Sequence, residues 1–249
     1  MRLGIVLLAC AVAVPVCADE VEQLLLPVAP SVVMCARNSR YETRLVVYNQ
    51  NERAVQPRCA EDGCGAFAPK AGREIHGGPN AAPIPSFLFL PKSEADHLRL
   101  SLVVESGERD HPENNSVAEL PVVRASEFRE GIVNVVGVRL DAGYRQTVRI
   151  YGLDGTQYGE VMLRVYDLDT GDFLAQWMYH LWPLSDERNE DGLALRPSFG
   201  MECDMSSVIP SNGQNVRVEL EPLTPGLKFW AFVSVTNNVT QHFYTIIPR

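Results

Sequence analysis

Four cysteines beyond the apolar N-terminus are the residues best placed for defined covalent chemistry: Cys35, Cys59, Cys64 and Cys203. Cys59 and Cys64 flank an Asp-Gly turn at residues 62 and 63, which brings two sulfur atoms within bonding range. This spacing predicts a Cys59–Cys64 disulfide in an oxidising compartment. Cys35 and Cys203 then pair with each other or stay free. A structural zinc site is disfavoured because these last two cysteines lie far apart with no histidine near them.

The run Asp-Leu-Asp-Thr-Gly-Asp at 167–172 places carboxylates at near-alternate positions, as calcium loops do. An EF-hand loop requires glycine at its sixth position and glutamate at its twelfth, where this chain has Asp172 and Met178. The same residues suit a tight hairpin turn, so a turn is the preferred interpretation. Calcium held jointly by several loops stays open.

No arrangement of titratable or nucleophilic residues in the sequence matches a catalytic motif. No nucleophile elbow, phosphate-binding loop or dinucleotide fingerprint is present. The five histidines are spread along the chain with no pair at ligand spacing: His76, His97, His111, His180 and His242. We therefore expect a protein that is not an enzyme, with no catalytic residue, no cofactor and no metal site.

Four aromatic residues could form a platform on which a sugar ring stacks: Trp177, Tyr179, Trp182 and Trp230. Aromatic residues at alternate strand positions more often fill the core of a β-sandwich, so the core interpretation is preferred. Exposure of the tryptophans separates the two, because a platform needs rings open to water.

The charge balance bears on the class of partner. The chain has 22 basic and 31 acidic residues, a net charge of -9. Binding of nucleic acid requires clustered lysine and arginine, whereas the basic residues here are scattered singly along the predicted strands. The expected partner is an extracellular protein or a glycan.

The N-terminus has the pattern of a secretory signal. Residues 3–16 are almost wholly apolar, and cleavage is predicted after Ala18, which makes 1–18 a signal peptide. A lipoprotein signal ending at Cys10 is a minor alternative. No stretch reaches the roughly 20 apolar residues of a membrane-spanning helix, so we expect a secreted, periplasmic or extracellular protein with no membrane span.

The elements that carry these residues are predicted to be β-strands. Four segments between Ile132 and Trp182 alternate in polarity and are separated by turn residues, which predicts a β-meander. Asp154-Gly155 and the 167–172 run supply residues that tolerate positive φ. Residues 57–85 predict a loop with an occasional short strand, from which binding residues could project. In the first segment of the meander, one side is predicted to carry Ile132, Val136, Val138 and Leu140.

The composition also predicts two domains. The segment 106–116 has no large apolar residue, as is typical of an exposed linker. We expect a first β-sandwich at 19–105 and a second at 117–249, because strands recur with no convincing amphipathic helix.

Three stretches resemble secreted bacterial proteins of uncharacterised role that carry tandem immunoglobulin-like or fibronectin-like modules: 24–33 (LLLPVAPSVV), 41–52 (YETRLVVYNQNE) and 230–248 (WAFVSVTNNVTQHFYTIIP). The resemblance implies an all-β fold of two tandem immunoglobulin-like sandwiches and an extracellular location. It implies no activity. The preferred hypothesis is a non-catalytic surface module with an architectural or adhesive role. The alternative is a carbohydrate- or peptide-binding domain that uses the 57–85 loop or exposed aromatic residues.

Overall fold

The regular secondary structure of the described part of the chain is almost wholly antiparallel β-strand. This computed structural model describes residues 20–35, 39–59, 64–77, 84–108, 110–203, 205, 209 and 213–248. Helical conformation within those residues is confined to α1 (Lys92–Ala95), the 3-10 turn η1 (Ala125–Glu127) and Met205, which has a 3-10 conformation. The prediction of an all-β protein is therefore confirmed. The predicted signal peptide, 1–18, lies outside the described residues.

The N-terminal half contains two sheets. The first has the strand order β4 (Arg58–Cys59), β6 (Ser86–Pro91), β1 (Val21–Leu26) and β9 (Val123–Arg124). The second has the order β2 (Ser31–Cys35), β3 (Ser39–Asn49), β7 (Leu98–Glu108) and β8 (His111–Pro121), with β5 (Gly72–His76) paired to β3.

The segment 106–116, predicted as a linker, is the end of the β7–β8 hairpin in its described part. Ser106 pairs with Ser116, and Glu108 pairs with His111. The Ser106 hydroxyl lies 3.1 Å from that of Ser116 and donates to the carbonyl of Gln241 at 3.1 Å. The polar composition that predicts a linker suits a polar hairpin equally well, because side chains such as these two serines can bond each other.

The C-terminal half is one eight-stranded sheet folded into a sandwich. One layer contains β10 (Val133–Arg139), β15 (Asn215–Pro222), β12 (Gly159–Asp167) and β13 (Phe173–Pro183). The other contains β14 (Ser198–Cys203), β11 (Tyr144–Gly152), β16 (Phe229–Asn237) and β17 (Phe243–Ile246). Alternate residues of each strand face the space between the layers, and on β12 the buried ones are Val161, Leu163 and Val165.

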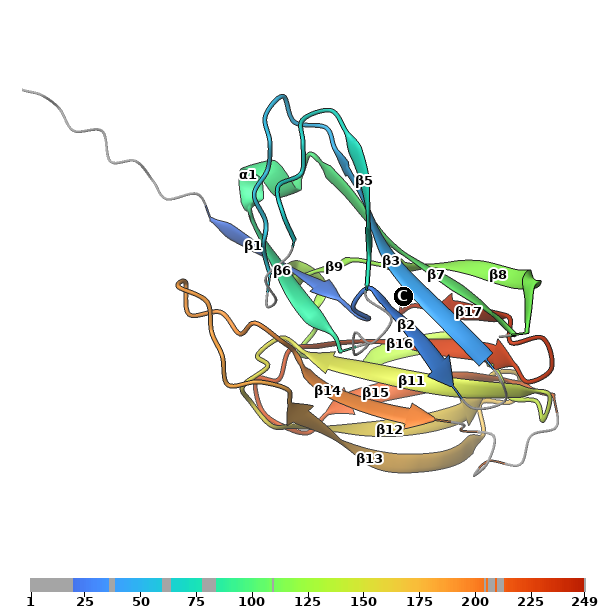
Figure 1. The fold of residues 1–249 in the computed structure, drawn as a ribbon. Coiled ribbons are helices and arrows are strands. Elements are labelled where there is room, and N and C mark those ends of the chain that lie inside the picture. The colour runs from blue at the N-terminus through green and yellow to red at the C-terminus, as the bar shows by residue number, and fades with distance from the viewer. Residues whose placement is uncertain are drawn as a thin grey trace, which may run out of the picture.

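The two halves share a core. Tyr151 of β11 and Phe232 of β16 are buried in the same cluster as Leu25 and Leu88 of the N-terminal half. The Tyr151 hydroxyl donates to the carbonyl of Pro27 at 3.0 Å. Figure 1 shows the N-terminal sheets over β11 and β16, with β12 and β13 on the far side of the sandwich. One face of the C-terminal sandwich is therefore covered, while the described residues leave the face formed by β12 and β13 open.

The four strands predicted between Ile132 and Trp182 are present, but they do not form a meander. Among them only β12 and β13 pair with each other. β10 pairs with β15, and β11 lies between β14 and β16. Local alternation predicts that a segment is a strand, but it carries no information about which distant strand completes its hydrogen bonds.

The two predicted turns differ in their use of glycine. In the β12–β13 turn, the Asp167 carboxylate accepts the backbone N–H groups of Asp169 and Thr170, both at 2.9 Å, and Gly171 has a φ of +79°. The hairpin interpretation of 167–172 is thus confirmed. Gly155 does not have a positive φ. A Cβ atom there would lie 1.4 Å from the carbonyl oxygen of Arg196, so close backbone approach requires this glycine.

Candidate functional site

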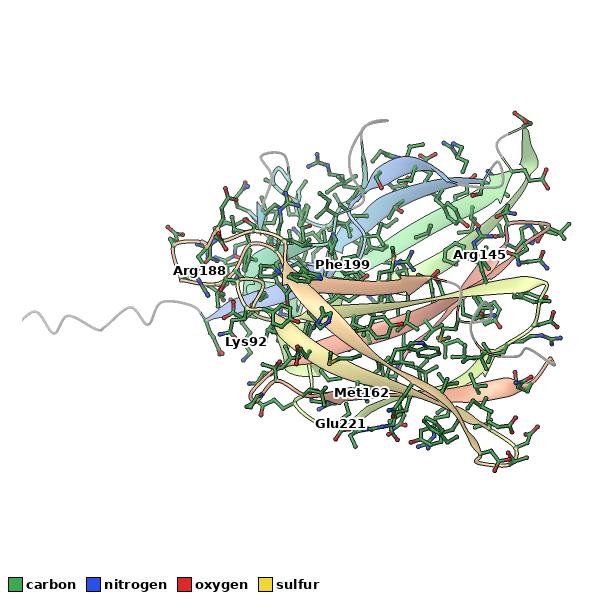
Figure 2. The ribbon with its side chains drawn as sticks, turned by 90° about the horizontal axis from the view of Figure 1, so that it is seen from below. Lys92, Arg145, Met162, Arg188, Phe199 and Glu221 are labelled. Carbon is green, nitrogen blue, oxygen red and sulfur yellow. A yellow bond between two sulfur atoms is a disulfide. The ribbon has the colours of Figure 1, made fainter. Side chains whose placement is uncertain are left out.

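The candidate site lies on the open face of the β12–β13 hairpin. Because side chains alternate along a strand, the burial of Val161 directs Glu160 and Met162 outward. Glu160 pairs across the hairpin with His180, and Met162 pairs with Met178. Figure 2 views the molecule from below and labels Met162 on this side. The hairpin therefore presents one continuous row of side chains to solvent.

Three rings contact one another at one end of this face, and we call Tyr158, His180 and Trp182 the aromatic cluster. Tyr158 stacks on His180 with ring centroids 5.6 Å apart, and it meets Trp182 edge to face at 5.1 Å. The His180 and Trp182 rings are 6.0 Å apart. Trp182 is 60% exposed and Tyr158 is 40% exposed. The cluster is thus ordered by its own ring contacts while its surface stays open to a ligand.

The carboxylate of Glu160 lies beside the cluster. The Tyr158 hydroxyl donates to Oε1 of Glu160 at 3.1 Å, and Nδ1 of His180 lies 3.6 Å from the same oxygen. The Tyr158 hydroxyl also contacts Nδ1 of His180. Partial desolvation, and then the hydrogen bond to Glu160, raises the pKa of Tyr158. The phenol therefore stays protonated at neutral pH, and the site offers both donors and acceptors next to apolar ring surface.

Arginines continue the open face away from the cluster, and each has a carboxylate partner. Arg164 lies 2.6 Å from Glu221 and 3.3 Å from Glu219. The pKa of Arg164 is raised, mainly by the hydrogen bond that it donates to Glu221. Arg217 lies 3.3 Å from Glu219 and 4.4 Å from the ring centroid of Tyr166. Since these charges are compensated, the face offers aromatic contact and hydrogen bonds rather than a charged receptor.

The acidic loop 185–192 is fixed by arginines. Arg58, next to the disulfide, bonds Glu190 and Asp191, the latter at 2.6 Å. Arg188 bonds Asp154 at 3.2 Å. Burial acts to raise the pKa of Asp154, but hydrogen bonds from Thr156 and Arg188 outweigh it and leave that pKa below its usual value. These ion pairs join the loop to the region of the disulfide and to the turn at Asp154, and they compensate the charges of Glu190 and Asp191.

One of the tryptophans is buried, as the core interpretation predicts, and one is exposed, as the platform interpretation predicts. Trp182 is exposed, as a platform requires, whereas Trp230 is 6% exposed and belongs to the shared core. Trp177 and Tyr179 are partly buried against the core of the C-terminal sandwich. The preferred core interpretation therefore holds for Trp230 but not for Trp182.

The cysteine prediction is confirmed where the structure describes it. Cys59 and Cys64 form a disulfide, with their Cα atoms 6.3 Å apart. The side chains of Cys35 and Cys203 lie outside the described residues, so their pairing stays a prediction. Among the described residues no three metal-ligating side chains gather into a group. In that same part of the chain, no helix has the length and hydropathy of a bilayer-spanning segment.

The segment 57–85, expected as a loop that could bind a partner, is tied to the core in its described part. Phe67 is 1% exposed, and it forms a backbone bridge with Val55 in which each N–H donates to the other carbonyl. The β5 strand pairs with β3 along 72–76. The described part of this segment therefore contributes core contacts as well as surface.

Tyr158 and Glu160 are members of the site that the sequence did not predict. The turn at 167–172 could have helped to find them, because the position of a hairpin turn predicts which residues of its two strands face each other. A bulge changes that register: Tyr166 pairs with Phe173, but Val165 pairs with Ala175. The extra residue, Leu174, brings His180 opposite Glu160 and so assembles the cluster.

Comparison with known proteins gives no match to a family model, to a curated protein or to a solved structure.

Proposed function

We propose that this chain is a secreted, non-catalytic binding module that holds a carbohydrate on the aromatic cluster. The observation that carries the proposal is the mutual contact of three solvent-accessible rings, Tyr158, His180 and Trp182, beside the carboxylate of Glu160. An ordered aromatic surface loses little side-chain entropy when it binds.

The chemistry of the cluster suits a sugar. The apolar C–H face of a pyranose buries area against an aromatic ring, and its hydroxyl groups need donors and acceptors at the edge of that contact. Glu160 supplies an acceptor, and His180 supplies a ring nitrogen. The adjacent arginines are already paired with Glu219 and Glu221, which favours an uncharged ligand.

The wider setting of this proposal is a surface protein with an adhesive role. The resemblance to secreted bacterial proteins supports an extracellular location and two immunoglobulin-like sandwiches as the architecture. The Cys59–Cys64 disulfide supports an oxidising compartment.

A peptide ligand is the second candidate, because apolar side chains extend the exposed surface. Met178 of β13 is exposed on the same face, and Leu223, whose N–H donates to the carbonyl of Glu160, is exposed on the other side of β12. Exposed apolar side chains that adjoin one another can mark a protein-binding surface.

The test measures retention of the purified mature chain on cellulose, chitin, xylan and peptidoglycan, followed by titration with soluble fragments of whichever polysaccharide binds. We expect Trp182→Ala to weaken binding at least about tenfold, since an aromatic anchor at a contact centre contributes about 2 kcal/mol or more. Tyr244→Ala is the matched control, because Tyr244 is an exposed aromatic residue on β17.

Retention by Trp182→Ala equal to that of the wild type would contradict the proposal. If no polysaccharide retains the wild type, while a peptide library yields a ligand that depends on Trp182, the peptide candidate replaces the carbohydrate.

A further inference from the structure

A cavity of about 310 Å³ lies between the two halves, where β2 and β3 cross the covered face of β11 and β16. Much of its wall is apolar and includes Val33, Val104, Leu120 and Phe232. Its volume is at the lower end of the range for small-molecule sites, roughly 300–1,000 Å³. Met201, 48% exposed, lies on its wall together with residues that are buried, so the cavity extends from the surface into the interior.

Arg149 brings a positive charge into this apolar space. Its guanidinium lies 5.5 Å from the ring centroid of Phe232, and Nη1 donates to Oγ of Ser234 at 2.9 Å. A guanidinium has five N–H donors, and no other partner for Arg149 is found in the described part of the chain. Most of its hydrogen-bonding capacity is therefore free for a ligand.

Arg145 lies on the same side of β11 but is held differently. Its guanidinium donates to the Tyr41 hydroxyl at 2.7 Å, to Gln241 at 2.8 Å and to Asn238 at 3.2 Å. All three partners are uncharged. Within the described residues neither Arg145 nor Arg149 forms an ion pair, although a partly buried charge is costly without one.

Ser31 gives an independent indication that this cavity accepts a polar group. It is 1% exposed, it lines the cavity, and its hydroxyl has no hydrogen-bond partner among the residues that the structure describes. A buried polar group without a partner is rare in folded proteins and needs an explanation, such as a bound group.

We propose that this cavity binds an aliphatic monocarboxylate of medium chain length, with the carboxylate on Arg149 and the hydrocarbon chain against Val33, Val104 and Leu120. A carboxylate supplies the counter-charge that Arg149 lacks, and it matches the planar fork of a guanidinium. The apolar wall accounts for the hydrocarbon part, because burial of a CH₂ group is favourable. This site is separate from the aromatic cluster, so either proposal can fail alone.

The test titrates the purified mature chain, stripped of bound lipid, with decanoate and with decanol by calorimetry. We expect decanoate to bind with one site per chain and more tightly than decanol. Arg149→Met should weaken decanoate binding by about tenfold or more, as loss of a charge-assisted hydrogen bond does, and leave decanol binding little changed.

Arg217→Met is the matched control, because Arg217 also packs over an aromatic ring but lies on the open face. Ser31→Leu fills the cavity and should abolish binding of both ligands, while thermal unfolding confirms that the variant is folded. The proposal is overturned if the wild type does not bind decanoate, if decanol binds as tightly, or if folded Ser31→Leu binds decanoate like the wild type.

Discussion

The covered and open faces of the C-terminal sandwich both carry aromatic residues, but these residues are buried on one face and exposed on the other. On the covered face, Tyr151, Trp230 and Phe232 are buried beneath the N-terminal half. On the open face, Tyr158 and Trp182 are exposed. The residue types do not distinguish the faces. Coverage by the N-terminal half decides whether an aromatic ring stabilises the fold or remains free for a ligand.

The arginines of the two faces differ in their counter-charges. Arg164 and Arg217 of the open face both bond Glu219. Glu219 lies on β15, the strand that carries Arg217 and that neighbours the strand of Arg164. Arg145 and Arg149 of the covered face have only uncharged partners among the described residues. This difference favours an uncharged ligand on the open face and an anion in the cavity.

The strongest predicted effect separates the buried tryptophan from the exposed one. Trp230→Ala should lower the free energy of unfolding by about 3–5 kcal/mol, because it leaves a cavity in the shared core. Trp182→Ala should cost less than about 1 kcal/mol, since it removes ring contacts at the surface. Urea denaturation measures both. Equal losses would mean that the two faces do not differ as described.

The disulfide tests the stability of the covering half. Replacing Cys59 and Cys64 together by serine should lower the free energy of unfolding by about 2 kcal/mol, since a short closed loop restricts the unfolded chain only modestly. The carbohydrate binding that we propose for the open face should not change. The control is the wild type under reducing conditions, and a loss of binding without a loss of stability would contradict the separation of the two regions.

A buried hydroxyl on the covered face should make stability depend on alkaline pH. Burial raises the pKa of Tyr151, so the folded state holds the phenol proton more tightly than the unfolded state does. The resulting stabilisation is fully present below the unfolded pKa of about 10 and is lost as pH rises above that value, where the unfolded state binds fewer protons. Tyr151→Phe should cost about 1 kcal/mol at neutral pH by removing the bond to Pro27.

The same variant should also lose less stability than the wild type from about pH 9 to about pH 11. Urea denaturation at several pH values checks this. A Tyr151→Phe variant with an unchanged alkaline loss would show that another group is responsible.

The weakest predicted effect is spectroscopic. Iodide should quench the fluorescence of Trp182 most and that of Trp230 least, because quenching requires access from solvent. Trp182→Phe should therefore remove most of the quenchable signal, and Trp230→Phe should leave it. Comparable quenching after both substitutions would contradict the assignment of Trp182 as the exposed ring.

A bulge changes which residues of the first C-terminal strand face the core. Alternation predicts Ile132, Val136, Val138 and Leu140 on one side, yet Val138 and Leu140 are buried while Ile132 and Val136 are exposed. The register of β10 shifts between Val136 and Val138, at Gly137, whose φ is +85°. A glycine inside a strand is a known signal of a bulge, so this change is predictable in principle. The bulge at Leu174 has no such signal.

Features that depend on residues close to one another in the sequence could be predicted from the sequence alone. The all-β class follows from alternation, the hairpin at 167–172 from its Asp and Gly residues, and the Cys59–Cys64 disulfide from a short separation. Which face of the C-terminal sandwich is covered, and which strands pair at long range, became visible only in the folded molecule. The physical reason is that burial and sheet pairing are set by distant segments, so the same aromatic or arginine side chain can serve the core or a ligand.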